Sequence, residues 1–172
     1  ATADEQAQQA VVEEMNKKFD AASAELDAYI RSLNQQYAGA DIHCSLDFRC
    51  PLSSYKYITT QYGQGGHKGV DLAAPQGTPI YAAADGVVTV AAYHYSYGNY
   101  VSIYHGSADD GNTYATLYAH MSQAPSVSTN QQVKKGDLIG YVGNTGYSFG
   151  NHLHLELRVN GNRTNPLSYI PH

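Results

Sequence analysis

The segment from Asn151 to Leu157 carries two histidines and a glutamate at alternate positions. Strict alternation of polar and apolar residues predicts a β-strand, because strand side chains point to opposite faces with a period of two. The apolar residues should face a core: Leu153, Leu155 and Leu157. His152, His154 and Glu156 should share the other face, where paired imidazoles could bind zinc. A His-x-His tripeptide alone is weak evidence, because two solvent-exposed histidines on a strand explain it as well as a zinc site does.

Groups of the same chemical kind lie upstream in two separate segments. His67 and Asp71 flank Gly69 in a glycine-rich stretch, so their spacing does not mark a helical pair. Asp71 enters the apolar run 70–74, where a partly buried carboxylate needs a partner. His120 closes the apolar segment 114–121. Each has an ordinary alternative, since Asp71 could cap a turn and His120 could be an interior histidine.

Together, the three segments offer the donor groups of a catalytic zinc site. Two histidines and one aspartate would supply three protein ligands and leave the fourth position to water. Two more histidines would then lie near the metal without binding it. No His-Glu-x-x-His motif is present, so the acid–base role would fall to histidine, whose ordinary pKa of about 6.5 suits it.

The composition narrows the class of protein. With 172 residues, 42% hydrophobic and 15% charged, the chain is typical of one folded domain plus an appendage. A net charge of −5 argues against nucleic-acid binding, which needs a basic surface. No apolar run approaches the ~20 residues of a membrane span. The 16 tyrosines suggest aromatic surfaces able to contact sugars or peptides.

The N-terminal part has the pattern of a helix. Residues 4–37 contain no Gly or Pro, and apolar residues recur there at spacings of three and four, so a helix ending before Gly39 is predicted. The apolar stripe consists of Val11, Met15, Phe19, Ala22, Leu26, Ile30, Leu33 and Tyr37. It needs a partner surface, either another chain or the following domain. We therefore interpret residues 1–38 as a coiled-coil or regulatory segment, which either controls access to the site or tethers the domain.

Residues 39–56 should form a connector that holds the only two cysteines, Cys44 and Cys50. Their closeness favours a local disulfide over two free thiols. Because disulfides persist outside the cytosol, the pair favours an extracytoplasmic protein. The chain starts at Ala1 without a signal peptide, so we interpret it as a processed or trimmed piece.

From about Tyr57 the pattern changes to β. Short runs rich in Val, Ile, Thr and Tyr, separated by Gly, Asn, Asp and Pro, predict strands. The predicted strands span residues 78–84, 86–93, 99–105, 113–121, 137–142 and 152–159. No helix is expected after residue 57. Residues 57–172 should therefore form a mostly β domain, closed as an antiparallel barrel or sandwich.

The polar residues singled out above resemble the motifs of lysostaphin-type (LytM-like) zinc metallopeptidases, which cut peptide bonds in bacterial peptidoglycan. Three further segments are similar to signatures of that family: residues 69–80, 133–140 and 143–146. The likeness runs from about Gly63 to Ile170 and leaves the helix and the connector outside. Residues 57–172 are thus identified as a LytM-like zinc peptidase domain.

The resemblance implies one zinc ion per chain and a role for each polar residue. His67, Asp71 and His154 would bind the zinc, and His120 and His152 would be catalytic. Tyr62, just before the first ligand, would reach the reacting carbonyl. The loop 62–66 is short and lacks the arginine of many relatives, so substrate preference does not carry over.

The resemblance also implies a function and a location. The chain would be a bacterial zinc endopeptidase that hydrolyses peptidoglycan stem peptides or cross-bridges, secreted or held in the cell wall or envelope. Its partner would be the peptidoglycan peptide, with a second chain able to bind the helix as a coiled coil. The alternative is a non-catalytic wall-binding or hydrolase-activating module of the same fold. Degenerate relatives of that kind lose metal ligands, whereas this chain retains them all.

Overall fold

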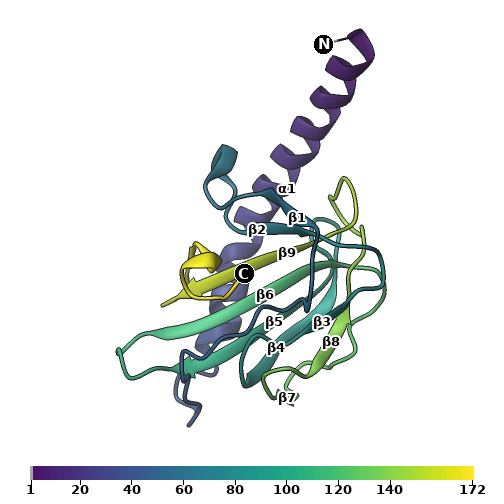
Figure 1. Ribbon diagram of the computed structural model, residues 1–172. Coiled ribbons are helices and arrows are strands. Elements are labelled where there is room, and N and C mark those ends of the chain that lie inside the picture. Colours follow the sequence, from purple (N-terminus) through teal and green to yellow (C-terminus); the bar gives the residue numbers. More distant parts are fainter. Residues whose placement is uncertain (1) are drawn as a thin grey trace.

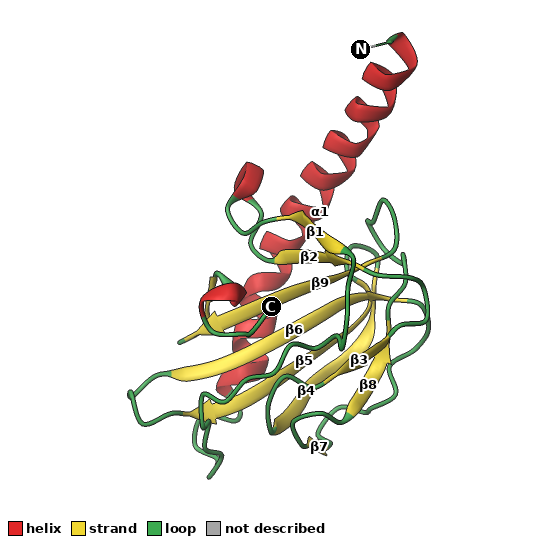
Figure 2. Cartoon of the chain, in the orientation of Figure 1, coloured by secondary structure: helices red, strands yellow, loops and turns green. Residues whose placement is uncertain are grey.

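The computed structural model describes residues 2–172 and shows a long helix against one face of a large β-sheet (Figures 1 and 2). The helix, α1 (Ala3–Gln35), begins at a capping box in which Thr2 and Glu5 bond each other's backbone N–H groups. The predicted helix is confirmed, although it ends at Gln35 rather than at residue 37. Ala1, the first residue of the predicted segment, lies outside the described residues.

Short strands fill the rest of the chain. They are β1 (Tyr57–Thr60), β2 (Val70–Ala73), β3 (Pro79–Tyr81), β4 (Gly86–His94), β5 (Gly98–Ser107), β6 (Thr113–Met121), β7 (Gln132–Val133), β8 (Leu138–Tyr141), β9 (His152–Val159) and β10 (Asn162–Thr164). Two 3-10 turns accompany them, η1 (Gln64–Gly66) and η2 (Pro166–Ser168). All six predicted strands are present, β6 and β9 with the predicted bounds and the other four with shifted ends, whereas β1, β2, β7 and β10 were not predicted.

The main sheet has the order β1-β2-β9-β6-β5-β4-β7, and β10 pairs with β9. The strand pairs in it are antiparallel, as are β3 and β8, which form a second sheet. The expected fold class, mostly antiparallel β behind one N-terminal helix, is therefore confirmed. Between α1 and β1 the chain runs as an irregular connector, as expected.

The main sheet separates two apolar clusters. The larger cluster includes Leu153, Leu155 and Leu157 of β9 together with residues of β3 and β8, so the face predicted for these leucines is correct. The other face of the sheet lies under α1. There Phe19 and Ile30 of the helix pack with a second cluster from β4 to β6: Val90, Tyr97, Tyr100, Leu117 and Ala119.

Only the second half of α1 is bound to the sheet. Its buried residues are Phe19, Ala22, Ser23, Ile30 and Asn34. The first half extends beyond the sheet (Figure 1), and Val11 there is 54% exposed. The apolar stripe thus has the domain itself as a partner from Phe19 onward, while a coiled-coil partner for the first half stays a prediction.

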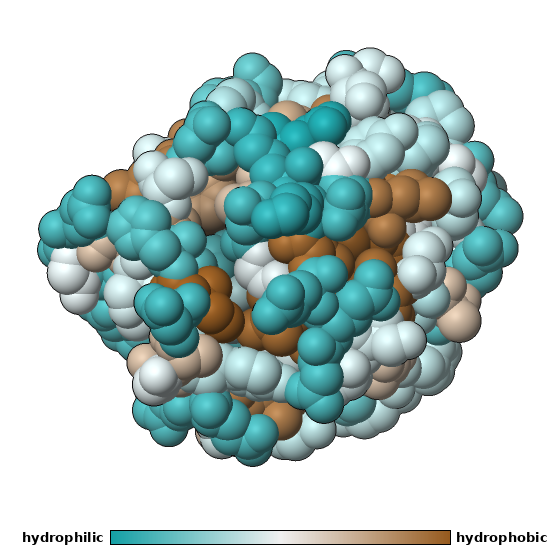
Figure 3. All heavy atoms as spheres, turned by 90° about the horizontal axis from the view of Figure 1, so that it is seen from below, coloured by the Kyte–Doolittle hydropathy of each residue, from teal (hydrophilic) through white to brown (hydrophobic). Residues whose placement is uncertain are grey.

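The face of the molecule seen from below is neither uniformly hydrophobic nor uniformly hydrophilic. Figure 3 shows apolar patches interrupted by hydrophilic side chains on this face. Within residues 2–172, no helix combines the length and the apolarity that crossing a bilayer requires.

The connector brings its two cysteines to the larger apolar cluster. Cys44 is buried in that cluster, and Cys50 packs against it. The structure contains both as free thiols, and burial raises the pKa of each. The predicted disulfide therefore stays a prediction.

We expect Cys44 and Cys50 to be linked in protein exposed to an oxidising environment, with a modest gain in stability because the closed loop is short. Thiol titration of the unreduced, denatured protein measures this directly. Two reactive thiols per chain would show that the pairing is wrong, and a reduced sample gives the control value.

Candidate metal centre and neighbouring histidines

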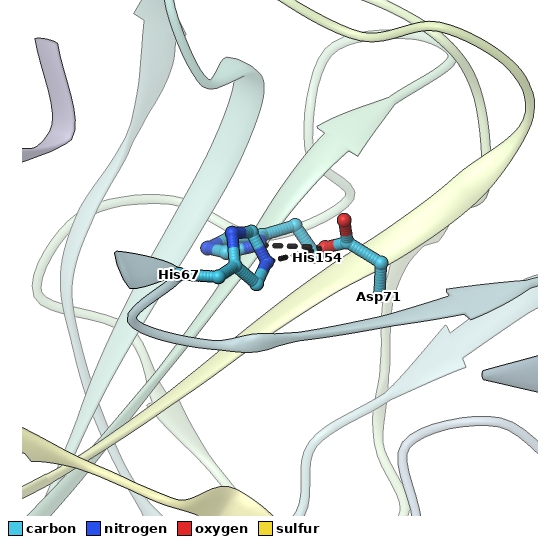
Figure 4. Close-up of side chains that lie close together, drawn as sticks. All are labelled: His67, Asp71 and His154. Carbon is cyan, nitrogen blue, oxygen red and sulfur yellow. Dashed lines mark hydrogen bonds and ion pairs between the residues drawn. The ribbon is translucent and has the colours of Figure 1, made fainter. Parts of the chain in front are cut away.

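Antiparallel pairing of β2 with β9 brings the first group of polar side chains together. Asp71 and His154 are direct cross-strand partners, and His67 reaches the same point from the turn after η1 (Figure 4). Asp71 Oδ1 lies 2.8 Å from His154 Nδ1 and 3.2 Å from His67 Nε2. All three side chains are buried. The predicted ligand trio is thus assembled in space, although 83 residues separate Asp71 from His154.

The spacing of these atoms suits a zinc ion. The three ligand atoms lie within 4.8 Å of one another. Ligands held at about 2.1 Å in a tetrahedron around zinc are about 3.4 Å apart, close to the separations given above. Two imidazoles and one carboxylate are also the donor types that zinc prefers. The residues present therefore fit the metal.

Two outer carboxylates fix the tautomers of the histidine ligands. Asp20 Oδ1 lies 3.4 Å from Nδ1 of His67, and Glu156 Oε2 lies 2.9 Å from Nε2 of His154. A carboxylate there accepts the N–H of each ring, so His67 Nε2 and His154 Nδ1 are the nitrogens that face Asp71, where a metal could replace the proton that each shares with that carboxylate. Glu156 itself is held by the hydroxyl of Tyr97, which donates to Oε2 at 2.8 Å.

The electrostatics of the trio favour a cation. Burial acts to raise the pKa of Asp71, but hydrogen bonds to His154 and His67 outweigh it and keep the pKa well below its ordinary value. Burial acts to lower the pKa of His67, yet the carboxylates of Asp20 and Asp71 raise that pKa to about 9. The ionised carboxylate thus attracts positive charge to this point, and zinc could take the place of the two ring protons.

The two other predicted histidines lie beside the trio. The rings of His120 and His152 are 4.8 Å apart, and the ring of His120 is 6.0 Å from that of His154. His120 Nδ1 lies 2.7 Å from the carbonyl of Thr145, and His152 Nδ1 lies 2.9 Å from that of Gly150. A carbonyl can only accept, so Nδ1 carries the hydrogen and Nε2 keeps a lone pair.

Burial, the largest influence, lowers the pKa of both His120 and His152. The two rings are therefore neutral near pH 7 and able to accept a proton. His120 also has a left-handed backbone with φ of 63°, which is unfavourable for a residue with a side chain and often marks a functional position.

The position just before β2, Gly69, has no room for a side chain. A Cβ atom at this position would lie 2.6 Å from Cε1 of His154 and 2.6 Å from the carbonyl oxygen of Leu155. The absence of a side chain thus lets the backbone pass directly over the ring of His154.

Helix α1 reaches the same centre, a position compatible with the interpretation that it controls access to the site, which stays a prediction. The ring of Phe19 lies 4.7 Å from that of His154, 5.3 Å from His120 and 6.1 Å from His67. Phe19 belongs to the predicted stripe, but no pattern indicated which surface it covers. Asp20 and Tyr97 were missed for the same reason, while the i+2 spacing of Glu156 from His154 could have indicated its contact.

The side chain of Tyr62 contacts strand β10. Its hydroxyl donates to the backbone carbonyl of Arg163 at 3.2 Å. Its role at a reacting carbonyl stays a prediction.

Comparison with known proteins defines the class. The model for peptidase family M23 matches residues 65–166, so the chain belongs to this family. Residues 1–64, which include the helix and the connector, and residues 167–172 lie outside the match. The resemblance to lysostaphin-type peptidases is therefore confirmed.

The names of three curated relatives describe different activities. The chain is 49% identical over 102 residues to the DD-carboxypeptidase/endopeptidase Mpg of Neisseria meningitidis, covering 59% of this chain and 22% of that protein. It is 44% identical over 130 residues to the peptidoglycan DD-endopeptidase ShyC of Vibrio cholerae, covering 74% and 29%. It is 38% identical over 129 residues to the murein hydrolase activator NlpD of Salmonella dublin, covering 70% and 32%. The chain thus spans less than a third of the length of each.

Solved structures agree on the fold. A putative M23 peptidase from Pseudomonas aeruginosa aligns with a TM-score of 0.70 at 28% identity, covering 86% of this chain and 60% of that one. A zinc-containing peptidase from Vibrio cholerae aligns with a TM-score of 0.61 at 34% identity, covering 69% and 39%.

We expect Gly69→Ala to weaken zinc binding by about tenfold or more, because the new methyl group must displace the ring of His154. Competition with a chromogenic chelator measures the affinity, and circular dichroism checks the fold. Gly39→Ala is the matched control, since a Cβ there meets nothing within 4 Å. Equal zinc affinity in a folded Gly69→Ala protein would contradict the expectation.

Proposed function

We propose that the chain is the catalytic part of a zinc-dependent endopeptidase that hydrolyses peptide bonds in peptidoglycan stem peptides or cross-bridges. The main support is the convergence of His67, Asp71 and His154, with one nitrogen of each ring directed at the same carboxylate oxygen. Membership of peptidase family M23 and the name of the relative ShyC agree with a peptidoglycan substrate. Such a substrate would place the chain in the cell envelope or outside the cell.

His67 through Nε2, His154 through Nδ1 and a carboxylate oxygen of Asp71 would hold the metal. Zinc supplies a Lewis acid that polarises a carbonyl and lowers the pKa of water to about 7. Glu156 and Asp20 would hold the rings of His154 and His67 in the binding tautomer, since each accepts the second N–H.

His120 and His152 would provide the proton transfers. Each ring presents Nε2 as an acceptor, because Nδ1–H is bonded to a backbone carbonyl. One ring takes the proton of the attacking water, and as an imidazolium it can return that proton to the leaving amine. The second, once protonated, would stabilise the negative charge of the tetrahedral intermediate. The structure assigns no order to the two.

The alternative function is that of a non-catalytic module that activates other hydrolases, which the similarity to the activator NlpD favours. Against it, all five polar residues are present in this chain and lie within one centre.

Digestion of purified peptidoglycan tests the proposal. The zinc-loaded protein should release fragments whose masses correspond to hydrolysed peptide bonds, and a chelator should stop the release until zinc is restored. Elemental analysis should give one zinc per chain. Zinc binding without any fragments would favour the non-catalytic module, and no stoichiometric zinc would reject the metal site.

We expect His120→Ala and His152→Ala each to lower kcat by about 10²–10⁴-fold while one zinc per chain is retained, because acid–base groups contribute that much and neither residue is needed as a ligand. Turnover and metal content are measured on the same samples. His43→Ala, at an exposed histidine in the connector, is the control. Full turnover by both variants, or zinc loss like that of His154→Ala, would overturn the assignment.

A further inference from the structure

We propose that Arg158 and Arg163 form a carboxylate-binding subsite of the substrate cleft, and that Asp27 of α1 occupies it here in place of substrate. Helix α1 is then a reversible internal inhibitor. The inference rests on the proposed function, since it names the acidic class of peptide that the same cleft would take.

The first step is that α1 lies over the working face of the sheet. His154, Glu156 and Arg158 alternate along β9 and share the face that carries the metal ligands. Phe19 of α1 contacts both a proposed ligand, His154, and a proposed catalytic residue, His120. A peptide bond could not approach both rings while the phenyl ring lies there.

The second step is an ionic contact further along the same strand. Arg158 donates through Nη1 to Asp27 Oδ1, and Nε of Arg163 lies 3.5 Å from the same oxygen. Arg163 also donates to the hydroxyl oxygen of Ser23. The two arginines thus bind one turn of α1 through a carboxylate and a neighbouring hydroxyl.

The third step is that the two arginines need an anion. They are direct cross-strand partners on β9 and β10, an arrangement in which like charges repel. Glu156 provides one negative charge, with Oε1 3.4 Å from Arg158 and Oε2 4.0 Å from Arg163. Without Asp27, two guanidinium groups would share one carboxylate that also bonds His154. The surface beneath α1 therefore carries an excess positive charge that a peptide carboxylate would neutralise.

The fourth step is the distance from the proposed metal ligand His154 to the arginine pair. Arg158 lies four positions after His154 on one strand, which corresponds to about 13 Å. An extended peptide with its reacting bond at the metal would present a carboxylate at the arginines about four residues away. Peptidoglycan stem peptides are short and carry free carboxylates, so this reach matches their size.

The contact that closes the cleft is limited enough to be reversible. The first half of α1 is exposed, and a cavity of about 420 Å³ lies between it and the metal centre. The cavity is lined by Val12 and Asn16 of α1 and by Thr59, Asp71 and His152 of the domain, among others. A substrate could therefore begin to bind beside α1 before it displaces Asp27.

The test uses the full chain loaded with zinc and a monomeric muropeptide, which contains no cross-bridge, and mass spectrometry checks that its stem peptide stays intact during the measurement. Its binding is measured by calorimetry, with free carboxylates and after their amidation. The variants are Asp27→Asn, alone and with Arg163→Gln. Glu25→Gln is the control on α1, because its carboxylate accepts from the hydroxyl of the exposed Tyr95 at 3.3 Å rather than from an arginine. Arg49→Gln is the control arginine, since Arg49 lies over Tyr81 of β3.

Asp27→Asn should bind the carboxylate form about tenfold or more tightly than the unaltered chain, because the internal competitor has lost its charge. Adding Arg163→Gln should remove that gain for the carboxylate form and leave the amidated form unchanged. Both control variants should behave like the unaltered chain. Unchanged binding by Asp27→Asn, or equal weakening of both forms by Arg163→Gln, would overturn the proposal.

A measurement without substitutions covers the case in which a variant does not fold. Excess carboxylate muropeptide should speed amide hydrogen exchange in the second half of α1 in the unaltered chain, and the amidated form should not. Equal exchange with both forms would reject the subsite. If the binding pattern holds while cross-linked muropeptide is not cleaved by Asp27→Asn, the subsite stands and the proposed peptidase activity fails.

Discussion

The antiparallel pairing of β2 with β9 is the constraint on which the rest of the centre depends. It sets Asp71 opposite His154, and the next pair in register sets Ala73 opposite His152. A shift of one residue would turn His152, His154 and Glu156 into the apolar core and the leucines toward α1. The burial of Leu153, Leu155 and Leu157 therefore fixes the histidines as firmly as any polar contact does.

Around that pairing, carboxylates organise the imidazoles. Asp71 lies between the two ligand rings, while Asp20 and Glu156 each bond the far side of one ring. Buried carboxylates are costly unless they are paired, so Asp71 and Glu156 are tolerated because of the histidines they contact, whereas Asp20 is only partly buried. His120 and His152 bond backbone carbonyls through Nδ1 and stay neutral, although Nε2 of His152 lies 3.7 Å from Asp71 Oδ1. This difference in partners separates groups that can bind a metal from groups that can accept a proton.

The sequence predicted the parts of this centre that are encoded by local periodicity. Alternation along 152–159 placed three polar residues on one face, and the stripe from Phe19 onward predicted a helix with a buried side. Strands β1, β2 and β10 have at most four residues, too few for a periodic signal, so their pairing could not be read from the sequence. The contacts of Asp20 and Asp27 could not be predicted either, because they depend on how α1 docks on a sheet that is distant in sequence.

That docking gives the chain two electrostatic centres on one face of the sheet. One is the trio of His67, Asp71 and His154, and the other is the arginine pair with Glu156. Glu156 connects them, because one oxygen bonds His154 while the other faces Arg158. An anion at the arginines would lessen their pull on Glu156 and leave its charge to the N–H of His154, which would make the opposite nitrogen a stronger donor. Through this one side chain, an occupant of the arginine pair, whether Asp27 or a substrate carboxylate, would influence the nitrogen of His154 that we propose as a metal ligand.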